Sequence, residues 1–283
     1  MNGDALVLPA ESRAAGARLH ITNWPVDGPR GVVILAHGLF EHAGRYTHVA
    51  ARMNAAGLAM VAVDHWGHGQ SDGTPNFVPS FDVYLDGMDA LLAHVRVQYP
   101  HLPLLLLGHS MGGLIAVSHL LAHHNSYVAA AVSGAAIMPA APPSRATLWI
   151  SRLLSRVAPR LGVVPLDATG VCRDPAVVAA YNADPLVYKG KVGARVAQQL
   201  FDAMAHARGG LGNIKLPLLV QHGDADSIAA PAGSTYLHEH AGSADKKLLL
   251  YPGLYHEIYN EPEQAAVLDD LILWFDAHLS RKA

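Results

Sequence analysis

Several kinds of residue that would assign the chain to a particular protein class are scarce in this sequence. There is one cysteine, Cys172, so neither an internal disulfide nor a metal site built from thiolates can form, and the composition fits a reducing compartment. No stretch of 18 consecutive apolar residues occurs, so we expect no membrane-spanning helix. Charged residues make up 15% of the chain, with a net charge of -3 and no basic block, which argues against nucleic acid as a partner.

The amino-terminal segment also lacks the features of a secretory signal. MNGDALVLPAESR contains an early acidic residue and no apolar stretch of the kind that a signal peptide needs. Apolar residues are abundant overall, at 51% of 283 residues, which is enough for one large domain with a substantial core. We therefore expect a soluble, cytoplasmic protein.

Short apolar runs alternate along the chain with longer segments of helical periodicity. The runs are apolar on both faces and are bounded by Gly, Pro or Asp, as expected for strands buried inside a parallel sheet. Alternation of this kind predicts an α/β fold with helices on both faces of the sheet. The expected strands are 31–37, 59–64, 103–108, 127–134, 217–223 and 246–252, and the expected helices are 44–56, 81–99, 111–124 and 262–279.

The alternation is interrupted between residues 140 and 212. This stretch opens with PAAPPS, contains no convincing strand, and carries helix-like segments separated by Pro, Gly and Asp. A long excursion between two core strands is typical of an inserted cap. We predict an α/β core formed by residues 1–139 and 213–283, a helical cap formed by residues 140–212, and no independent second domain.

A G-x-S-x-G pattern, GHSMG at residues 108–112, lies where a predicted strand meets a predicted helix. A nucleophile elbow has this position: a sharp turn exposes a serine above the sheet, and the glycines let neighbouring backbone pass closely. The alternative is a serine with only a structural role in the turn. The context favours Ser110 as a nucleophile at the positive end of the following helix.

A serine nucleophile needs a general base, and an acid must orient that base. The loop QHGDADSIAAP (221–231) follows a predicted strand and offers two aspartates. We prefer Asp226, which is clear of the strand end, whereas Asp224 is better placed to cap the turn. The loop YPGLYHEIYNEP (251–262) follows the last predicted strand and offers His256 as the base. The order serine, aspartate, histidine along the chain is the one this type of fold requires.

An oxyanion hole requires two backbone N–H groups near the nucleophile. One is expected from Met111, directly after the serine, and the other from the loop AHGLFEHAGRY (36–46), which follows an earlier strand. In that loop His37 and Gly38 end the strand, so Leu39 is expected to supply the second N–H.

Several of these motifs together are similar to those of a known family. HGLFEHAGRY (37–46), VDHWGHGQSDG (63–73), GHSMGG (108–113) and YNADPL (181–186), with the loops that carry the expected acid and base, resemble the monoacylglycerol lipase group of α/β hydrolases. That group includes proteins described as lysophospholipases, and the resemblance extends from about Gly31 to the carboxyl-terminal helix. It implies a carboxylester hydrolase that acts on a small lipid ester, monoacylated glycerol, through an acyl-serine, with no metal or cofactor.

The resemblance also suggests residues around the substrate. It assigns Glu41 and Arg45 to the polar end of the pocket, although an ion pair that anchors the loop is an equally good interpretation. Tyr181 is either a contact for the glycerol head or a packing residue of the cap. Tyr259, three residues after the base, stands where vertebrate members carry a histidine and is a further candidate for substrate contact. Trp66 replaces the arginine usual in the D-x-R-G-H-G pattern.

The predicted cap contains a basic amphipathic segment, SRATLWISRLLSRVAPRLG (144–162). Arginines recur every four residues at Arg152, Arg156 and Arg160, opposite the apolar residues. Such a helix can lie on a membrane surface as a peripheral contact. Alternatively, its apolar face lines an acyl tunnel or packs on the core. Cys172 lies in the same cap, where we interpret it as a small apolar residue rather than a reactive thiol.

Other functions are compatible with the same motifs. A broader carboxylesterase or a lysophospholipase would use the same triad, because the shape of the cap sets substrate choice. A proline aminopeptidase or a C–C bond hydrolase would share the fold but lack the HG-x-x-EH loop. A non-catalytic lipid-binding protein of this fold is disfavoured because all three triad residues are present.

Overall fold

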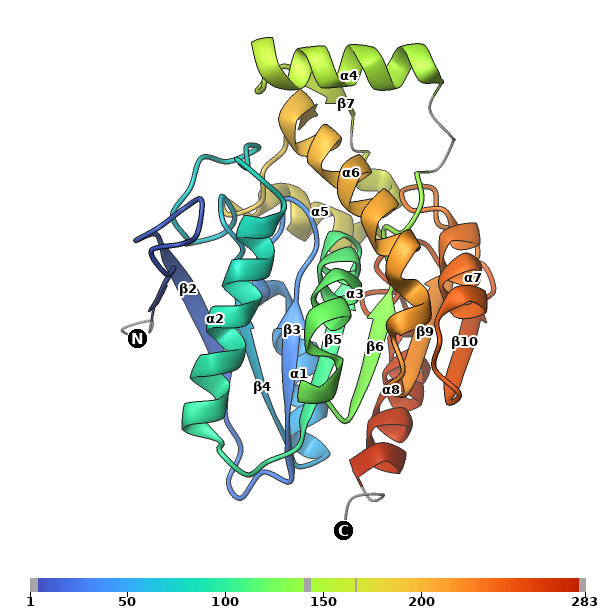
Figure 1. Cartoon of the computed structure of the whole chain (residues 1–283). Helices are drawn as coiled ribbons and strands as arrows, with labels where there is room; N and C mark the ends of the chain where they lie inside the picture. Colours follow the sequence, from blue (N-terminus) through green and yellow to red (C-terminus); the bar gives the residue numbers. More distant parts are fainter. Residues whose placement is uncertain (1–4, 140–143, 166, 280–283) are drawn as a thin grey trace.

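The computed structural model describes residues 5–139, 144–165 and 167–279 of the chain. Residues 140–143, where the cap was predicted to begin, lie outside the described residues. A central sheet is covered by helices on both faces, and a group of helices lies above its carboxyl-terminal edge (Figure 1). Among the described residues, no helix combines the length and the apolar character needed to cross a bilayer.

Eight strands form the central sheet, in the order β1-β2-β4-β3-β5-β6-β9-β10. From β4 to β10 all neighbours are parallel, whereas β1 and β2 join antiparallel at one edge. The strands are β1 (Ala5–Val7), β2 (Arg18–Trp24), β3 (Gly31–Ala36), β4 (Leu58–Val63), β5 (Leu104–His109), β6 (Ala129–Ser133), β9 (Leu218–Gly223) and β10 (Lys246–Tyr251).

Each face of the sheet buries its own hydrophobic cluster, because successive side chains of a strand point to opposite faces. In β3, Val32 and Ile34 pack against one set of helices, while Val33 and Leu35 pack against the other. The first set comprises α2 (Asp82–Gln98), α3 (Met111–His123) and α7 (Pro231–His240), and the second comprises α1 (Thr47–Ala55) and α8 (Gln264–Leu279). Burial on both faces explains why the inner strands β3, β4, β5 and β6 are almost uniformly apolar.

The segment between β6 and β9 contains the helices predicted for the cap. They are α4 (Arg145–Val157), α5 (Pro175–Ala183) and α6 (Ala194–Gly210), and α6 packs against both α4 and α3. The expectation of no strand in this segment was wrong: β7 (Gly162–Val164) and β8 (Val192–Gly193) pair antiparallel in a small second sheet. These strands are too short to produce a recognisable alternation in the sequence. Four 3-10 turns also occur among the described residues: η1 (Ala43–Tyr46), η2 (His124–Ser126), η3 (Ala168–Gly170) and η4 (Leu211–Asn213).

The segment after α5 is attached to the loop that follows β3. The backbone N–H of Tyr188 donates to the carbonyl oxygen of Phe40 over 3.0 Å, and the two rings pack 4.7 Å apart. A contact of 2.9 Å joins the His42 ring to Asp184. The cap is thereby held against the loop from which an oxyanion-hole amide was expected.

The predicted α/β fold is confirmed, and the six expected strands agree with the observed ones to within about two residues at each end. One detail was wrong: β10 is not buried on both faces, since it forms an edge of the sheet and Leu250 is largely exposed. The strands β1 and β2 and the helix α7 were not predicted.

Candidate active site

Ser110 lies at the sharp junction between β5 and α3, at the carboxyl end of the sheet. Its backbone has φ 55° and ψ −118°, a positive φ that non-glycine residues rarely adopt. The serine is also the N-cap position of α3, so its side chain projects near the positive end of the helix dipole. This is the geometry expected of a nucleophile elbow.

The glycines around the serine are required by close backbone contacts. A Cβ atom on Gly112 would lie 2.0 Å from the carbonyl oxygen of Ala36, and one on Gly108 would lie 2.5 Å from the carbonyl oxygen of Gly112. Neither backbone atom can move without displacing a strand or the helix that holds Ser110. The G-x-S-x-G spacing therefore reflects how tightly α3 is packed against β3 and β5.

The structure brings together the three residues predicted as nucleophile, base and acid. The Nε2 atom of His256 is 2.8 Å from Ser110 Oγ, and its Nδ1 atom is 2.6 Å from Asp226 Oδ2. Because a carboxylate only accepts hydrogen bonds, Nδ1 carries the proton and Nε2 is free to accept the serine proton. Asp224 lies apart from this group and accepts a hydrogen bond from the N–H of Gly253, which fits the turn-capping role expected for it.

The Asp226 carboxylate is held by four hydrogen bonds. The backbone N–H groups of Ile228 and Ala229 donate to Oδ1, and the rings of His256 and His222 contact Oδ2. Burial alone would raise the pKa of this carboxyl, but the charge of His256 and these hydrogen bonds hold the pKa well below its usual range. Asp226 is therefore ionised throughout the physiological pH range.

The environment of His256 favours its charged form. The ring is buried, which by itself would lower its pKa, yet the adjacent Asp226 carboxylate and the nearby Glu257 and Glu41 raise the pKa above 6.5. The neighbouring His109, which precedes the serine, behaves in the opposite way, since burial and the charge of His256 lower its pKa to about 3. Of these two packed imidazoles, only His256 can accept a proton near neutral pH.

The loop after β3 places Leu39 beside the nucleophile. Leu39 and Met111 both line the same cavity as Ser110, and neither backbone N–H has a hydrogen-bond partner among the described residues. Glu41 fixes the loop, because its Oε1 accepts hydrogen bonds from the Gly38 N–H at 2.6 Å and from the Tyr46 hydroxyl at 2.7 Å.

Arg45 links the loop after β3 to the segment that carries the base His256. Its guanidinium forms an ion pair with Glu41 at 2.5 Å and a two-pronged contact with Glu257 at 2.6 and 2.7 Å. Its charge also lies 4.8 Å from the centre of the Tyr181 ring. Arg45 and Glu41 therefore form the loop-anchoring ion pair that was one of the two interpretations of these residues.

An apolar cavity of about 260 Å³ opens at Ser110. Its polar end is formed by Glu41, His109, Ser110, Tyr181, His256 and Glu257. Within the described part of the chain, the Tyr181 hydroxyl makes no hydrogen bond, so it is available to a bound molecule. The rest of the lining is apolar and comes from the core, the cap and the loop after β9; it includes Met138, Val164, Leu200, Phe201, Met204 and Ile228.

Tyr259 does not contact this cavity, contrary to its place among the candidate substrate-binding residues. It is buried in the hydrophobic cluster under α8, and its hydroxyl donates a 2.8 Å hydrogen bond to Gln221 Oε1. Three residues after His256 the chain has already turned inward toward β9. The register of the loop, which sequence spacing does not reveal, explains the difference.

Three supporting residues were not predicted. His222 orients Asp226, Glu257 neutralises Arg45, and His37 accepts a 2.9 Å hydrogen bond from the His65 N–H at the base of the oxyanion loop. Glu257 directly follows His256, His37 directly follows β3, and His222 is the penultimate residue of β9. With 18 histidines in the chain, the residue type alone did not distinguish them.

The chain is similar to known proteins over most of its length. The family model for serine aminopeptidase, S33, matches residues 27–263. A monoacylglycerol lipase from Mycolicibacterium smegmatis is 42% identical over 93% of this chain and 95% of its own length. The crystal structure of the Paleococcus ferrophilus monoacylglycerol lipase superposes with a TM-score of 0.82 at 29% identity, covering 92% of this chain and 99% of that one.

A second solved structure has a bound ligand. It is a soluble variant of the Saccharomyces cerevisiae monoglyceride lipase in complex with a substrate analogue, with a TM-score of 0.82 at 26% identity. The alignment covers 98% of this chain and 97% of that one.

Proposed function

Because this chain belongs to the serine aminopeptidase S33 family of α/β hydrolases, and its relatives include monoacylglycerol lipases, we propose that it hydrolyses monoacylglycerols to fatty acid and glycerol. The observation that carries the proposal is the 2.8 Å contact between His256 Nε2 and Ser110 Oγ at the mouth of an apolar cavity. One acyl chain fits such a lining, and the reacting ester carbonyl then lies at the polar end.

The reaction proceeds by acyl transfer to the serine. Ser110 Oγ attacks the ester carbonyl carbon as His256 Nε2 takes its proton, and the oxyanion is bound by the N–H groups of Leu39 and Met111. His256 then protonates the departing glycerol oxygen, which breaks the ester bond. Asp226 stabilises the imidazolium at 2.6 Å in both steps.

Hydrolysis of the acyl-serine completes the cycle. A water molecule gives a proton to His256 Nε2 and attacks the acyl carbon, and the tetrahedral intermediate collapses with release of the fatty acid. The proton returns from His256 to Ser110.

The glycerol head is recognised at the polar end of the cavity. Arg45 and Glu41 are paired with one another and with the loop, so we assign both a positioning role, although Glu41 also lines the cavity. Tyr181 offers a free hydroxyl, and burial raises its pKa, so it remains a hydrogen-bond donor at neutral pH. We assign the contact with a glycerol hydroxyl to Tyr181.

A substrate panel tests the proposal. Fatty acid release is measured from monoacylglycerols of C8 to C18, with di- and triacylglycerol, lysophosphatidylcholine and a short p-nitrophenyl ester alongside and Ser110→Ala as the blank. A clear preference for monoacylglycerol supports the assignment. A preference for lysophosphatidylcholine or for the short ester would retain a serine hydrolase and reject the substrate.

The same panel tests the head-group contact. Tyr181→Phe should raise KM for monoacylglycerol about tenfold, as expected for one lost hydrogen bond, and leave the p-nitrophenyl ester unaffected. Equal effects on both esters would indicate that Tyr181 only packs within the cap.

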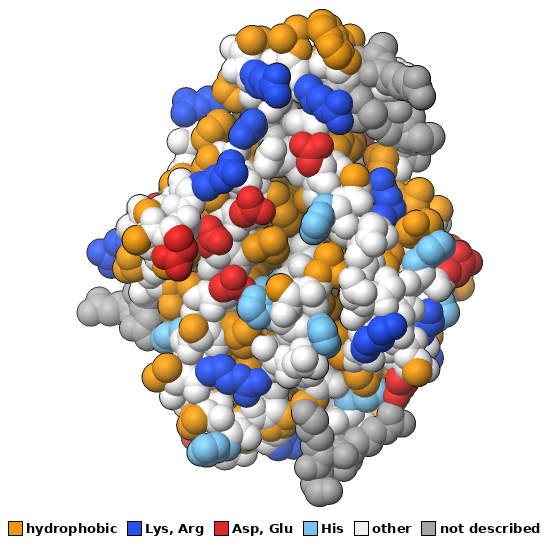
Figure 2. Space-filling view, in the orientation of Figure 1, with side chains coloured by type: hydrophobic (Ala, Val, Ile, Leu, Met, Phe, Trp, Pro, Cys, Tyr) orange, Lys and Arg blue, Asp and Glu red, His pale blue; other side chains and the backbone are white. Residues whose placement is uncertain are grey.

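Peripheral contact with a lipid surface through the cap is also part of this proposal. None of the described side chains of α4 lines the cavity, and Trp149, Ile150 and Val157 face outward, each at least half exposed. Figure 2 shows hydrophobic side chains along the upper edge of the molecule, over α4, with Lys and Arg side chains directly below them. This arrangement is typical of a helix that lies in a membrane interface.

A further inference from the structure

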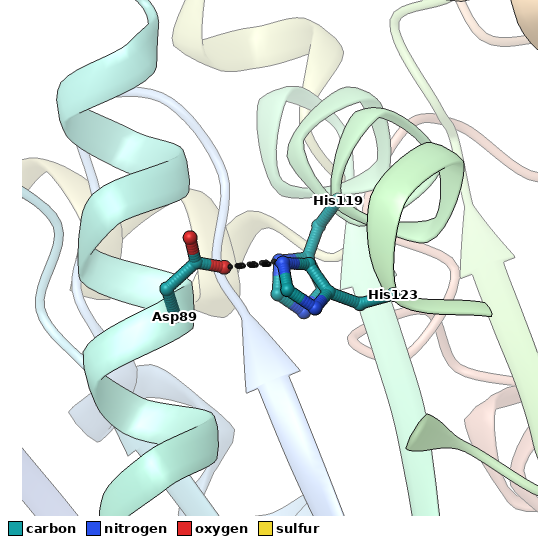
Figure 3. A group of neighbouring side chains, drawn as sticks. All are labelled: Asp89, His119 and His123. Carbon is teal, nitrogen blue, oxygen red and sulfur yellow. Dashed lines mark ion pairs between the residues drawn. The ribbon is translucent and has the colours of Figure 1, made fainter. Parts of the chain in front are cut away.

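Two histidines and an aspartate meet at the outer side of the helix that begins at the nucleophile. His119 and His123 are one turn apart on α3, and Asp89 faces them from α2 (Figure 3). The group is remote from the cavity, since His119 is about 13 Å along the helix axis from Ser110. None of the three residues takes part in the proposed reaction.

The distances between the three potential ligand atoms suit a small divalent cation. Asp89 Oδ1 is 3.1 Å from His119 Nδ1 and 3.0 Å from His123 Nε2, and all three atoms lie within 4.8 Å of one another. Ligands at about 2.1 Å from a tetrahedral zinc ion are separated from each other by about 3.4 Å. Small side-chain rotations would therefore bring all three ligands to bonding distance.

One ligand atom is buried and has no aligned hydrogen-bond partner among the described residues. His119 is only 2% exposed, and its Nδ1 atom contacts the Asp89 carboxylate at 3.1 Å as an ion pair without the alignment of a hydrogen bond. The other ring nitrogen, Nε2, is 2.9 Å from the Tyr127 hydroxyl. A metal-binding histidine typically has this arrangement, in which a hydrogen bond on one nitrogen fixes the ring and leaves the other nitrogen for the ion.

The electrostatics favour a cation shared by neutral rings over two charged histidines. The two rings stack with centroids 4.5 Å apart, so protonation of both would place like charges in contact. A neutral imidazole can bind a metal cation through the lone pair of a ring nitrogen, whereas it contributes little to an ion pair with Asp89.

We propose that Asp89, His119 and His123 form a binding site for a divalent transition metal of the zinc class, with water in the remaining coordination position. Two imidazoles and one carboxylate are a donor set that suits zinc, cobalt and nickel better than magnesium or calcium. The site is accessible because the side chains of Asp89 and His123 are 50% and 35% exposed. The bound ion would join α2 to α3 and stabilise the fold.

Calorimetric titration of chelator-treated protein with Zn²⁺ tests the site. The wild type should bind one Zn²⁺ with micromolar affinity, and His123→Gln should weaken binding at least tenfold. The variant leaves the buried ring of His119 in place, so its fold should be retained, which circular dichroism checks. His240→Gln is the matched control, because His240 is an exposed helical histidine that also stacks on a ring one turn away, and it should bind like the wild type.

Two further measurements make the outcome decisive. Zn²⁺ should raise the Tm of the wild type in a concentration-dependent manner. Mg²⁺ should not raise the Tm of the wild type, and Zn²⁺ should not raise the Tm of His123→Gln. Co²⁺ should produce visible absorption bands that Asp89→Asn and His123→Gln both abolish. Unchanged Zn²⁺ affinity in His123→Gln, or binding that disappears only when His256 is substituted, would overturn the proposal. Neither result would bear on the proposed hydrolysis, which uses other residues.

Discussion

The backbone N–H of Gly38 donates a 2.6 Å hydrogen bond to the buried carboxylate of Glu41. This contact fixes the His37–Gly38 peptide, one residue before the N–H of Leu39, which is the proposed second donor to the oxyanion. The orientation of that N–H thus depends on a side chain whose carboxylate is already engaged by hydrogen bonds within the loop. The ion pair between Glu41 and Arg45 therefore helps to hold the Leu39 N–H in position before the oxyanion forms.

Substitution of Glu41 should therefore lower kcat more than it changes KM. We expect Glu41→Ala to reduce kcat by about 10²-fold, because one oxyanion donor is lost or misplaced. Glu41→Gln retains an oxygen that can accept from Gly38 and should lose only about tenfold. Steady-state kinetics on a p-nitrophenyl ester measures both variants. A rise in KM with unchanged kcat in Glu41→Ala would instead assign the residue to substrate binding.

The two aspartates of the loop after β9 should behave very differently. Asp226→Asn should reduce kcat by about 10⁴-fold, because an amide does not hold His256 in the reactive tautomer. Asp224→Asn should have wild-type activity, since this carboxylate only accepts a hydrogen bond from Gly253. The pair is matched in sequence position and chemistry. Comparable losses in both variants would mean that the loop, and not one carboxylate, supports the reaction.

The pH dependence of kcat/KM should follow the protonation of His256. Its pKa in the folded protein is raised above that of an ordinary histidine and the base must be neutral, so activity should fall as the pH drops through this raised pKa. His109, with a pKa of about 3, stays neutral and should not affect this limb. In Asp226→Asn the carboxylate charge that raises the pKa of His256 is absent, so the acidic limb of the kcat/KM profile should move to lower pH. An unshifted limb would assign the titration to another group.

Glycine at position 112 should be essential for folding. Gly112→Ala places a methyl group 2.0 Å from the Ala36 carbonyl oxygen and should cost about 3 kcal/mol or more in the free energy of unfolding. Gly209→Ala, in the last turn of α6, meets no atom within 4 Å and should stabilise the protein by about 0.5–1 kcal/mol. Urea denaturation measures both. Equal stability of the two variants would contradict the packing of α3 on β3.

The order of the site along the chain could be predicted because it depends on local patterns. Ser110, Asp226 and His256 each follow an apolar strand of the parallel part of the sheet, and a parallel sheet brings such loops to one edge. The contacts that tune these residues depend instead on tertiary packing. His222 reaches Asp226 from within β9, where its sequence context is that of any buried strand residue.

Tyr259 shows why loop contacts were harder to predict than strand ends. A loop has no fixed period, so three residues after His256 can point into the cavity or into the core. Here the hydroxyl finds Gln221 in β9, and the side chain becomes part of the core under α8. In β2 the alternation of buried and exposed residues is present, but polar residues dilute it too much for a strand to be predicted.

The exposed side of α4 supports a prediction about lipid surfaces. Trp149, Ile150, Leu153 and Val157 share one side of the helix, while Ser155, on the opposite side, is buried and contacts Arg195 of α6. The apolar residues are thus directed outward by the way α4 packs on α6. An interpretation in which they line the acyl cavity does not fit the described residues of that cavity.

Val157→Asp should weaken binding to phosphatidylcholine vesicles containing anionic phosphatidylglycerol by about tenfold, since one apolar side chain no longer enters the interface. Leu273→Asp is the matched control: Leu273 is 66% exposed, against 68% for Val157, but lies on α8. Sedimentation with vesicles measures binding, and turnover of a short water-soluble ester should be unchanged in both variants. Because Arg152 and Arg156 border the apolar side, binding should also weaken when the anionic lipid is omitted. Equal binding of both variants, or no dependence on anionic lipid, would remove α4 as the membrane contact and leave the cavity chemistry as it stands.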